Sequence, residues 1–178
     1  FQGLNATAEL VNQDDQFNQV NRNLATLRAN YRLPNQSIVD VKVGYSTELH
    51  EGASGTFSVP GFGATARYTG RIQGVSLSAQ GRYNSPNYSS QFRGSVDFNT
   101  NARYNLGETT YVGLRVNMNS RNPEIYSKGI LFPRREFVRN TFEGQYGWAT
   151  ENGNFMVYPR YTYEEVLDLR TSTTGMGL

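Results

Sequence analysis

Hydrophobic and polar residues alternate along most of the chain with a period of two. Between Phe92 and Leu106, every second residue is apolar or small, and the intervening residues are charged or polar. Because side chains of a β-strand point alternately to its two faces, this spacing predicts a strand with one apolar and one polar face. The segment spans about fifteen residues, whereas strands in soluble proteins usually have roughly 5–6.

Seven further segments alternate in the same way, which makes eight expected strands. They are 24–33, 39–49, 62–72, 75–83, 111–118, 138–148 and 155–164. Weaker alternation at 4–10 and 171–178 predicts up to ten strands. Short connections at 34–37, 73–74, 107–108 and 152–153 take turns with longer linkers at 50–61, 84–90 and 120–135. This order predicts an antiparallel sheet with short turns at one end and long loops at the other.

The composition excludes several classes of protein. With 37% hydrophobic residues and a mean hydropathy of −0.60, no segment has the roughly 20 apolar residues that a transmembrane helix needs. The 18 Gly, 12 Tyr and 10 Phe argue against a helical protein. The absence of cysteine and the single histidine exclude thiolate and multi-histidine metal sites, so we expect no metal and no cofactor. A net charge of +2 is too small to indicate nucleic acid.

The charged residues lie almost entirely on the polar face of the expected strands. There the sequence places eleven basic residues, Arg28, Arg32, Lys42, Arg67, Arg71, Arg82, Arg93, Arg103, Arg115, Arg139 and Arg160, and five acidic ones, Asp40, Glu48, Asp97, Glu143 and Glu164. The apolar face has no Lys or Arg within the eight segments. Because a cation costs roughly 2–4 kcal/mol at the bilayer midplane, this exclusion favours a lipid-facing surface.

Aromatic residues on the apolar face concentrate near the strand ends. Tyr31, Tyr104, Tyr146, Trp148 and Phe155 lie beside the short turns, and Tyr45, Phe62, Tyr83, Phe92, Tyr161 and Tyr163 lie toward the long loops. Smaller residues such as Val41, Ala79 and Val116 lie between them. Two aromatic girdles of this kind are typical of membrane interfaces.

In this alternation, charge placement and girdle pattern, nearly the whole chain resembles the porin-like class of bacterial outer-membrane β-barrels. The resemblance implies an outer-membrane location, lipid as a partner, and a role as a pore, a conduit or a scaffold. Two features depart from the class: the chain ends in Leu178 rather than an aromatic residue, and Pro159 interrupts the last strong strand. Both lead us to expect that the chain is part of a larger barrel.

The polar face carries the candidate lumen-lining residues Arg67, Arg71, Arg82, Arg93, Asp97, Arg103, Arg115, Arg139, Glu143 and Arg160. Two interpretations stay open. In a small barrel these side chains form a plug of ion pairs, and in a wider barrel they line a basic pore that favours anions.

Other candidates are weaker. His50 is expected to be a solvated histidine at the rim, and the adjacent Glu164 and Glu165 point to opposite faces. The longest linker holds an apolar stretch beside two cations, which is a candidate loop for contact with a partner protein: Ile130, Leu131, Phe132, Arg134 and Arg135.

The sequence therefore predicts an all-β protein, an antiparallel transmembrane β-barrel of about 8–10 strands, with residues 1–178 as one domain or a fragment of a longer barrel. The favoured function is a pore or conduit wall with a net basic lumen, for passive transport or export, without catalysis. The alternative is a structural barrel that presents external loops to a partner protein. A soluble β-sandwich that binds glycans and an enzyme centred on His50 are the less favoured interpretations.

Overall fold

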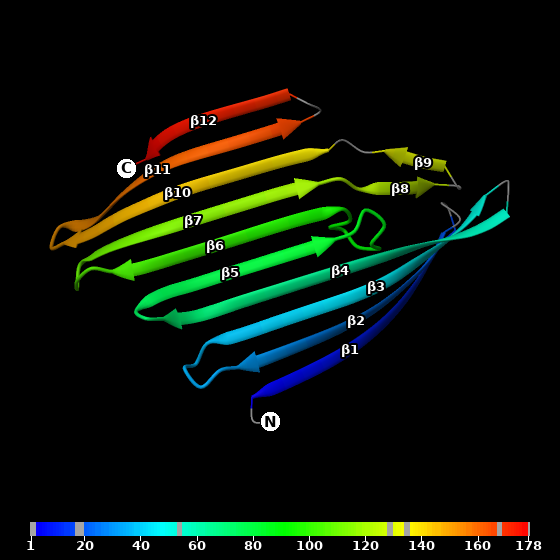
Figure 1. The fold of residues 1–178 in the computed structure, drawn as a ribbon, viewed down its shortest axis with the longest axis horizontal. Helices are drawn as coiled ribbons and strands as arrows, with labels where there is room; N and C mark the ends of the chain where they lie inside the picture. Colours follow the sequence, from blue (N-terminus) through cyan, green and yellow to red (C-terminus); the bar gives the residue numbers. More distant parts are fainter. Residues whose placement is uncertain are drawn as a thin grey trace.

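Ten long antiparallel strands form one sheet in the computed structural model of the chain (Figure 1). The structure describes residues 3–16, 20–52, 55–127, 130–133, 136–166 and 169–177, and within these ranges it contains no helix. The strands of the sheet are β1 (Leu4–Asp15), β2 (Val20–Arg32), β3 (Ile38–Gly52), β4 (Gly55–Ile72), β5 (Val75–Asn84), β6 (Ser95–Asn105), β7 (Thr110–Arg121), β10 (Phe137–Thr150), β11 (Gly153–Val166) and β12 (Leu169–Gly177).

Each strand of the sheet pairs with the next one along the chain. The only insertion in this order, within the ranges just given, is a small hairpin of β8 (Glu124–Ser127) and β9 (Ile130–Pro133). It lies between β7 and β10 in the chain and extends past the ends of these two strands (Figure 1). The predicted all-β, antiparallel architecture is therefore confirmed.

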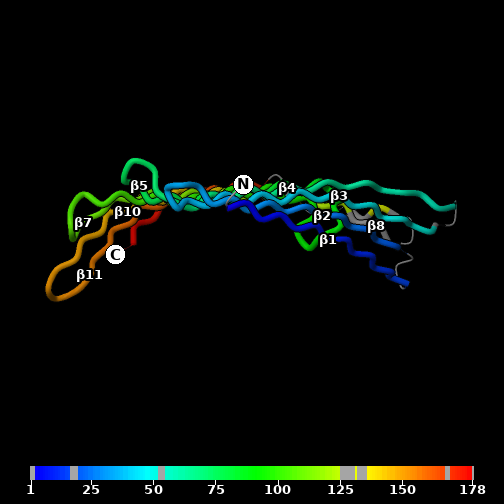
Figure 2. The backbone as a smooth tube through the Cα atoms, turned by 90° about the horizontal axis from the view of Figure 1, so that it is seen from below, coloured from blue at the N-terminus to red at the C-terminus, as the bar shows by residue number. Residues whose placement is uncertain are grey.

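The sheet is open. β1 and β12 lie at its opposite edges, with the N-terminus beside one and the C-terminus beside the other (Figure 1). Seen edge-on, the backbone forms a single thin layer without a second layer of strands over either face (Figure 2). The predicted closed barrel is thus not observed, because no ladder joins β1 to β12 in the described part of the chain.

Several strand boundaries differ from those expected. The two segments with weak alternation are full edge strands, β1 and β12. Their backbones pair with β2 and β11, and this pairing stabilises them although their own side-chain pattern is weak. The expected linker 50–61 is mostly strand, since β3 and β4 pair as far as Gly52 and Gly55. β6 begins at Ser95 rather than Phe92.

Pro159 does not end its strand. β11 runs from Gly153 to Val166, and its ladder with β10 is interrupted opposite Gly144 and Gln145, where the proline lacks an amide donor. The proline thus interrupts the pairing locally, as expected.

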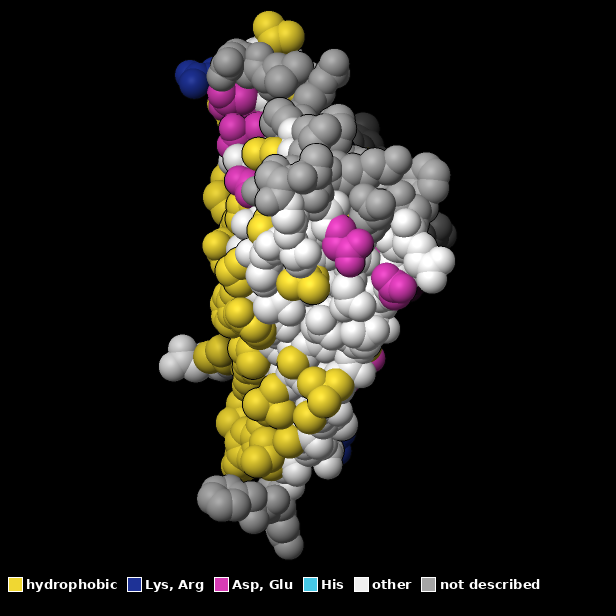
Figure 3. Space-filling view, turned by 90° about the vertical axis from the view of Figure 1, so that its right-hand side faces the viewer, with side chains coloured by type: hydrophobic (Ala, Val, Ile, Leu, Met, Phe, Trp, Pro, Cys, Tyr) yellow, Lys and Arg dark blue, Asp and Glu magenta, His cyan; other side chains and the backbone are white. Residues whose placement is uncertain are grey.

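The apolar positions of neighbouring strands lie in register and form one continuous face. Across β6 and β7, Phe98 lies opposite Met118. Each of the ten strands exposes at least one large hydrophobic side chain, and examples on this face are Leu27, Val41, Leu114 and Phe142. Viewed along the strands, hydrophobic side chains gather along one side of the layer (Figure 3). The described residues therefore form no conventional core beneath this face.

The few buried hydrophobic side chains lie on the opposite, polar face. They are Val20, Val59 and Tyr88, and the last belongs to the connection between β5 and β6. This connection, residues 85–94, folds back over the strands and covers part of that face.

The tight turn between β4 and β5 requires a left-handed backbone. Gln73 and Gly74 have φ values of 47° and 84°, the sign that favours glycine in a two-residue hairpin. A Cβ built on Gly74 would also lie 3.2 Å from Cε2 of Tyr104.

We therefore expect Gly74→Ala to lower the free energy of unfolding by about 1 kcal/mol. The measurement is a urea titration followed through the fluorescence of Trp148, the single tryptophan. The matched control is Gly107→Ala, because Gly107 lacks a positive φ and has no atom within 4 Å of a built Cβ. Equal losses in both variants would contradict this account of the turn.

Candidate functional site

The polar face of the sheet holds a set of ion pairs that cross from strand to strand. Among the described residues, five carboxylates take part in them: Asp15, Asp40, Glu48, Asp97 and Glu143. The single pair on the apolar face of the described strands, Glu165 with Arg170 at 3.2 Å, lies at the end where β11 and β12 meet. Charge is thus concentrated on one face, as the alternation requires.

Glu48 of β3 is the most enclosed of these carboxylates, with 1% of its side chain exposed. Its Oε1 accepts a hydrogen bond from Arg22 Nε at 3.2 Å and one from Ser89 Oγ at 2.8 Å. Arg93 approaches both carboxylate oxygens, with its Nη1 3.0 Å from Oε2. Because Ser89 and Arg93 come from the 85–94 segment, Glu48 anchors that segment to the sheet.

The 85–94 segment also fits into a groove left by glycines. The amide of Ser89 donates to Ser46 Oγ at 2.9 Å. A Cβ built on Gly63 would lie 2.5 Å from Cε1 of Tyr88, and one on Gly44 would overlap the Tyr88 hydroxyl. The absence of side chains at these positions allows the Tyr88 ring to lie against the strands.

Tyr88 is 7% exposed in this groove. Burial raises the pKa of its phenol above the usual value, because the phenolate would lose its hydration. The hydroxyl is therefore neutral at physiological pH, and the segment adds no negative charge through this ring.

His50 is not the solvated rim residue that we expected. It is fully buried, its ring stacks on Phe57 with a centroid separation of 5.1 Å, and its Nε2 lies 3.3 Å from Glu48 Oε2. The expectation was wrong because β3 and β4 remain paired past this residue, which places His50 within the sheet beside Phe57 and Glu48 rather than at a rim.

Two further carboxylate clusters, around Glu143 and Asp97, lie farther along the sheet. Glu143 accepts hydrogen bonds from Arg160 and Gln145, each at 2.8 Å, and Arg115 lies 3.8 Å away. Asp97 pairs with Arg82 at 3.1 Å and accepts a hydrogen bond from Asn119. These contacts neutralise much of the positive charge near the middle of the face.

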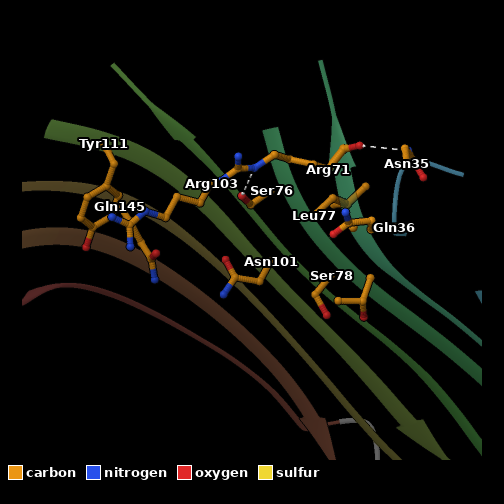
Figure 4. Close-up of a pocket in the computed structure, with 12 residues that line it drawn as sticks. Asn35, Gln36, Arg71, Ser76, Leu77, Ser78, Asn101, Arg103, Tyr111 and Gln145 are labelled. Carbon is orange, nitrogen blue, oxygen red and sulfur yellow. Dashed lines mark hydrogen bonds between the residues drawn. The ribbon is translucent and has the colours of Figure 1, made fainter. Parts of the chain in front are cut away.

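At the end of the polar face near the short turns, two arginines have no carboxylate partner among the described residues. Arg71 and Arg103 line an open hollow of about 690 Å³ together with the side chains of Ser76, Ser78, Asn101 and other polar residues. Figure 4 shows Arg71 extended toward Ser76, and Arg103 extended toward Tyr111 and Gln145. Arg103 is stacked on the Tyr111 ring, with Cζ 3.7 Å from the ring centroid. Among the described residues, neither arginine has a carboxylate within 4 Å.

The predicted lumen residues all lie on the polar side, but they are not equivalent. Arg82, Arg93, Arg115 and Arg160 form ion pairs, whereas Arg67, Arg71, Arg103 and Arg139 have none within the described residues. Arg93 belongs to the 85–94 segment and not to a strand. Phe92, assigned to the apolar girdle, lies instead on the polar side, where Arg82 Cζ is 3.9 Å from its ring centroid.

The predicted partner loop is only partly described. Ile130, Leu131 and Phe132 belong to β9, and Leu131 is 43% exposed, while Arg134 and Arg135 lie outside the described residues. Its role in binding a partner stays a prediction.

Sequence reasoning missed three residues of the Glu48 cluster. Arg22 and Asp15, which pair at 3.2 Å, lie beyond the expected strand ends, and Ser89 lies in a linker with no recognisable motif. A longer predicted strand would have included Arg22, which lies on the polar face of β2 and opposite Glu48.

Neither a metal site nor a membrane-crossing helix is found in the described ranges. No group of three or more His, Asp or Glu side chains there is arranged to hold a metal ion. None of the described residues forms a helix that could cross a membrane. Comparisons with family models, curated proteins and solved structures found no match for this chain.

We expect Gly63→Ala to displace the 85–94 segment, because the new methyl group would occupy the place of the Tyr88 ring. Hydrogen exchange of the backbone amides of residues 85–94 should then accelerate at least tenfold. The free energy of unfolding should fall by roughly 1–3 kcal/mol. Gly81→Ala is the matched control on the adjacent strand, since a Cβ there has no atom within 4 Å. Unchanged protection in Gly63→Ala would show that the segment does not pack against this groove.

Proposed function

We propose that this sheet is the wall of a β-barrel in a bacterial outer membrane, and that its polar face lines a conduit with a net basic lumen. The observation that carries the proposal is the asymmetry of the layer. One face exposes large apolar side chains across the sheet, and the other holds seven of the eight ion pairs between arginine and carboxylate side chains found among the described residues.

Exposure of such an apolar face to water is unfavourable. The largest apolar patch on a typical soluble monomer covers roughly 300–600 Å². Here exposed residues such as Leu27, Val43, Phe98, Leu114 and Phe142 extend over the strands from β2 to β10. Hydrocarbon chains of lipid would cover this face without requiring a second protein layer.

The height of the apolar band suits a bilayer. On β3 the apolar positions run from Val39 to Leu49, which corresponds to roughly 33 Å along the strand at the usual rise per residue. A tilt of about 45° reduces this to roughly 23 Å across the membrane, close to the ~25 Å band of outer-membrane barrels.

Aromatic side chains at both ends of the band support the same orientation. At the short-turn end Trp148 stacks with Phe155 at 5.6 Å between centroids and lies 5.7 Å from Tyr146. Toward the other end, the ring centroids of Phe62 and Tyr83 lie 6.5 Å apart. Rings of this kind favour the level of the lipid headgroups.

The topology permits closure into a barrel. The order is a simple meander with an even number of strands, so β1 and β12 run antiparallel to each other. In the proposed barrel these edges are joined directly or through further strands, which satisfies their free backbone groups. The polar face then faces inward, and Arg67, Arg71, Arg103 and Arg139 give the lumen its positive charge.

A second function, a structural barrel that presents its loops to a partner protein, is favoured by one observation. The 85–94 segment is anchored on the polar face and would narrow the interior of a ten-stranded barrel, which side chains already nearly fill. In this alternative the β8–β9 hairpin, which extends past the ends of β7 and β10, is the contact site.

The lipid-facing assignment is tested by adjacent residues at the centre of β6. Both Phe98 and Asn99 are exposed, and they point to opposite faces. Phe98→Arg should destabilise the membrane-inserted protein by about 2–4 kcal/mol, because a cation would enter the hydrocarbon. Asn99→Arg adds the same charge on the polar face and should change stability by less than about 1 kcal/mol.

The measurement is folding into lipid vesicles, followed by urea titration. Equal tolerance of the two arginines, or full solubility of the folded protein without lipid or detergent, would overturn the membrane assignment.

Conductance in planar bilayers separates the two functions. A basic conduit should favour anions, and the preference should weaken at high salt because screening reduces the field of the arginines. The double variant Arg67→Gln with Arg139→Gln should shift the reversal potential toward cations. A barrel that inserts but shows no steady conductance would favour the structural alternative, and a wild-type preference for cations would contradict the basic lumen.

A further inference from the structure

The hollow at the short-turn end of the polar face has the chemistry of a binding site for small phosphate-bearing solutes, and we propose that it binds them through Arg71 and Arg103. This site lies on the polar face whether or not that face lines a pore, so the inference goes beyond the conduit.

The strand register brings the two arginines into one row. Arg71 of β4 lies opposite Ser76 of β5, which lies opposite Arg103 of β6. Two strand spacings separate the arginine backbones by roughly 10 Å, with the short serine side chain between them. The Arg71 side chain extends toward Ser76, and the Arg103 side chain extends from β6 toward Tyr111, so both guanidinium groups lie along this row (Figure 4).

Beyond Arg103 the row continues across a glycine, and the Gln145 side chain reaches over it. Arg103 lies opposite Gly113 of β7, which lies opposite Gln145 of β10, so the position beside Arg103 has no side chain. A Cβ built on Gly113 would lie 3.0 Å from Oε1 of Gln145. The hollow of about 690 Å³ lies beside this row and is large enough for a solute of several rings.

The two arginines are held in place without being neutralised. The Arg71 Nε lies 3.5 Å from Ser76 Oγ, and Arg103 is stacked on Tyr111 and donates to Asn105 at 3.3 Å. Among the described residues, no carboxylate lines this hollow. Glu108 lines the adjoining hollow beside Arg103 without an ion pair within 4 Å.

Within the described residues, the absence of paired carboxylates distinguishes Arg71 and Arg103 from most other arginines of the polar face and indicates an anionic ligand. Arg22, Arg82, Arg93 and Arg160 already hold carboxylates of the protein. Arg71 and Arg103 instead offer two guanidinium forks, whose geometry matches the oxygens of phosphate. The serine hydroxyls and the Asn101 amide add neutral hydrogen-bonding groups, as in sites that hold a phosphorylated solute.

The test is titration calorimetry of the folded full chain, in detergent if it requires it, with inorganic pyrophosphate as the probe. We expect saturable binding that is weakened at least tenfold by Arg103→Gln and by Arg71→Gln. Sulfate should compete, and chloride at the same ionic strength should not.

Arg139→Gln is the matched control. It removes one exposed positive charge from the polar face outside the hollow and should weaken binding less than twofold. Arg103→Lys retains the charge without the fork, so an affinity between those of wild type and Arg103→Gln is expected if the fork contributes. Circular dichroism checks that each variant is folded, and Arg71→Gln and Arg103→Gln test the site independently of each other.

Lack of saturable binding, or equal weakening by Arg139→Gln and Arg103→Gln, would overturn the proposal. The result is independent of the conduit: a protein that binds pyrophosphate but fails the Phe98 and Asn99 comparison retains the anion site and loses the membrane assignment. Conversely, a conducting barrel that does not bind pyrophosphate retains the conduit and loses the anion site.

Discussion

A single layer of strands has no interior, so its stability depends on what covers each of its two faces. Backbone hydrogen bonds hold the ten strands together, but they do not distinguish one face from the other. The side chains do: one face exposes Leu, Val, Phe and Tyr from strand to strand, and the other carries paired charges. A nonpolar environment on the first face and water on the second would satisfy both, which is the condition at the wall of a membrane barrel.

The polar face is organised by where its carboxylates lie. Glu48, Asp97 and Glu143 neutralise arginines at the end that carries the 85–94 segment and across the middle of the sheet. Few acids reach the short-turn end, and Arg71 and Arg103 have no carboxylate partner there among the described residues. The face therefore divides into a structural part, where charge holds a segment down, and a part where charge is available to a solute.

The 85–94 segment connects packing with function. Gly44 and Gly63 lack the side chains that would exclude Tyr88, and Glu48 binds Ser89 and Arg93. In a closed barrel this segment would lie inside and reduce the cross-section of the lumen. Conduction through such a barrel would then depend on how firmly one buried carboxylate and one aromatic ring hold the segment in place.

The period-two pattern by itself determined the strands and their faces. It was sufficient because each side chain of a strand alternates between faces whatever the partner strand is, so residues such as Val96 and Asp97 are assigned from local spacing alone. It was weaker at the edges, where β1 and β12 have few large apolar residues, and at 50–61, where Gly and Pro suggested a loop.

Only the tertiary structure decided which charges meet and what covers the polar face. Arg93 and Glu48 are 45 residues apart in the chain, and their contact depends on the path of a connection that carries no motif. The burial of His50 and the row of Arg71, Ser76 and Arg103 likewise depend on strand length and register. Register is set by the sum of many pairings between strands, and no single segment of sequence contains that information.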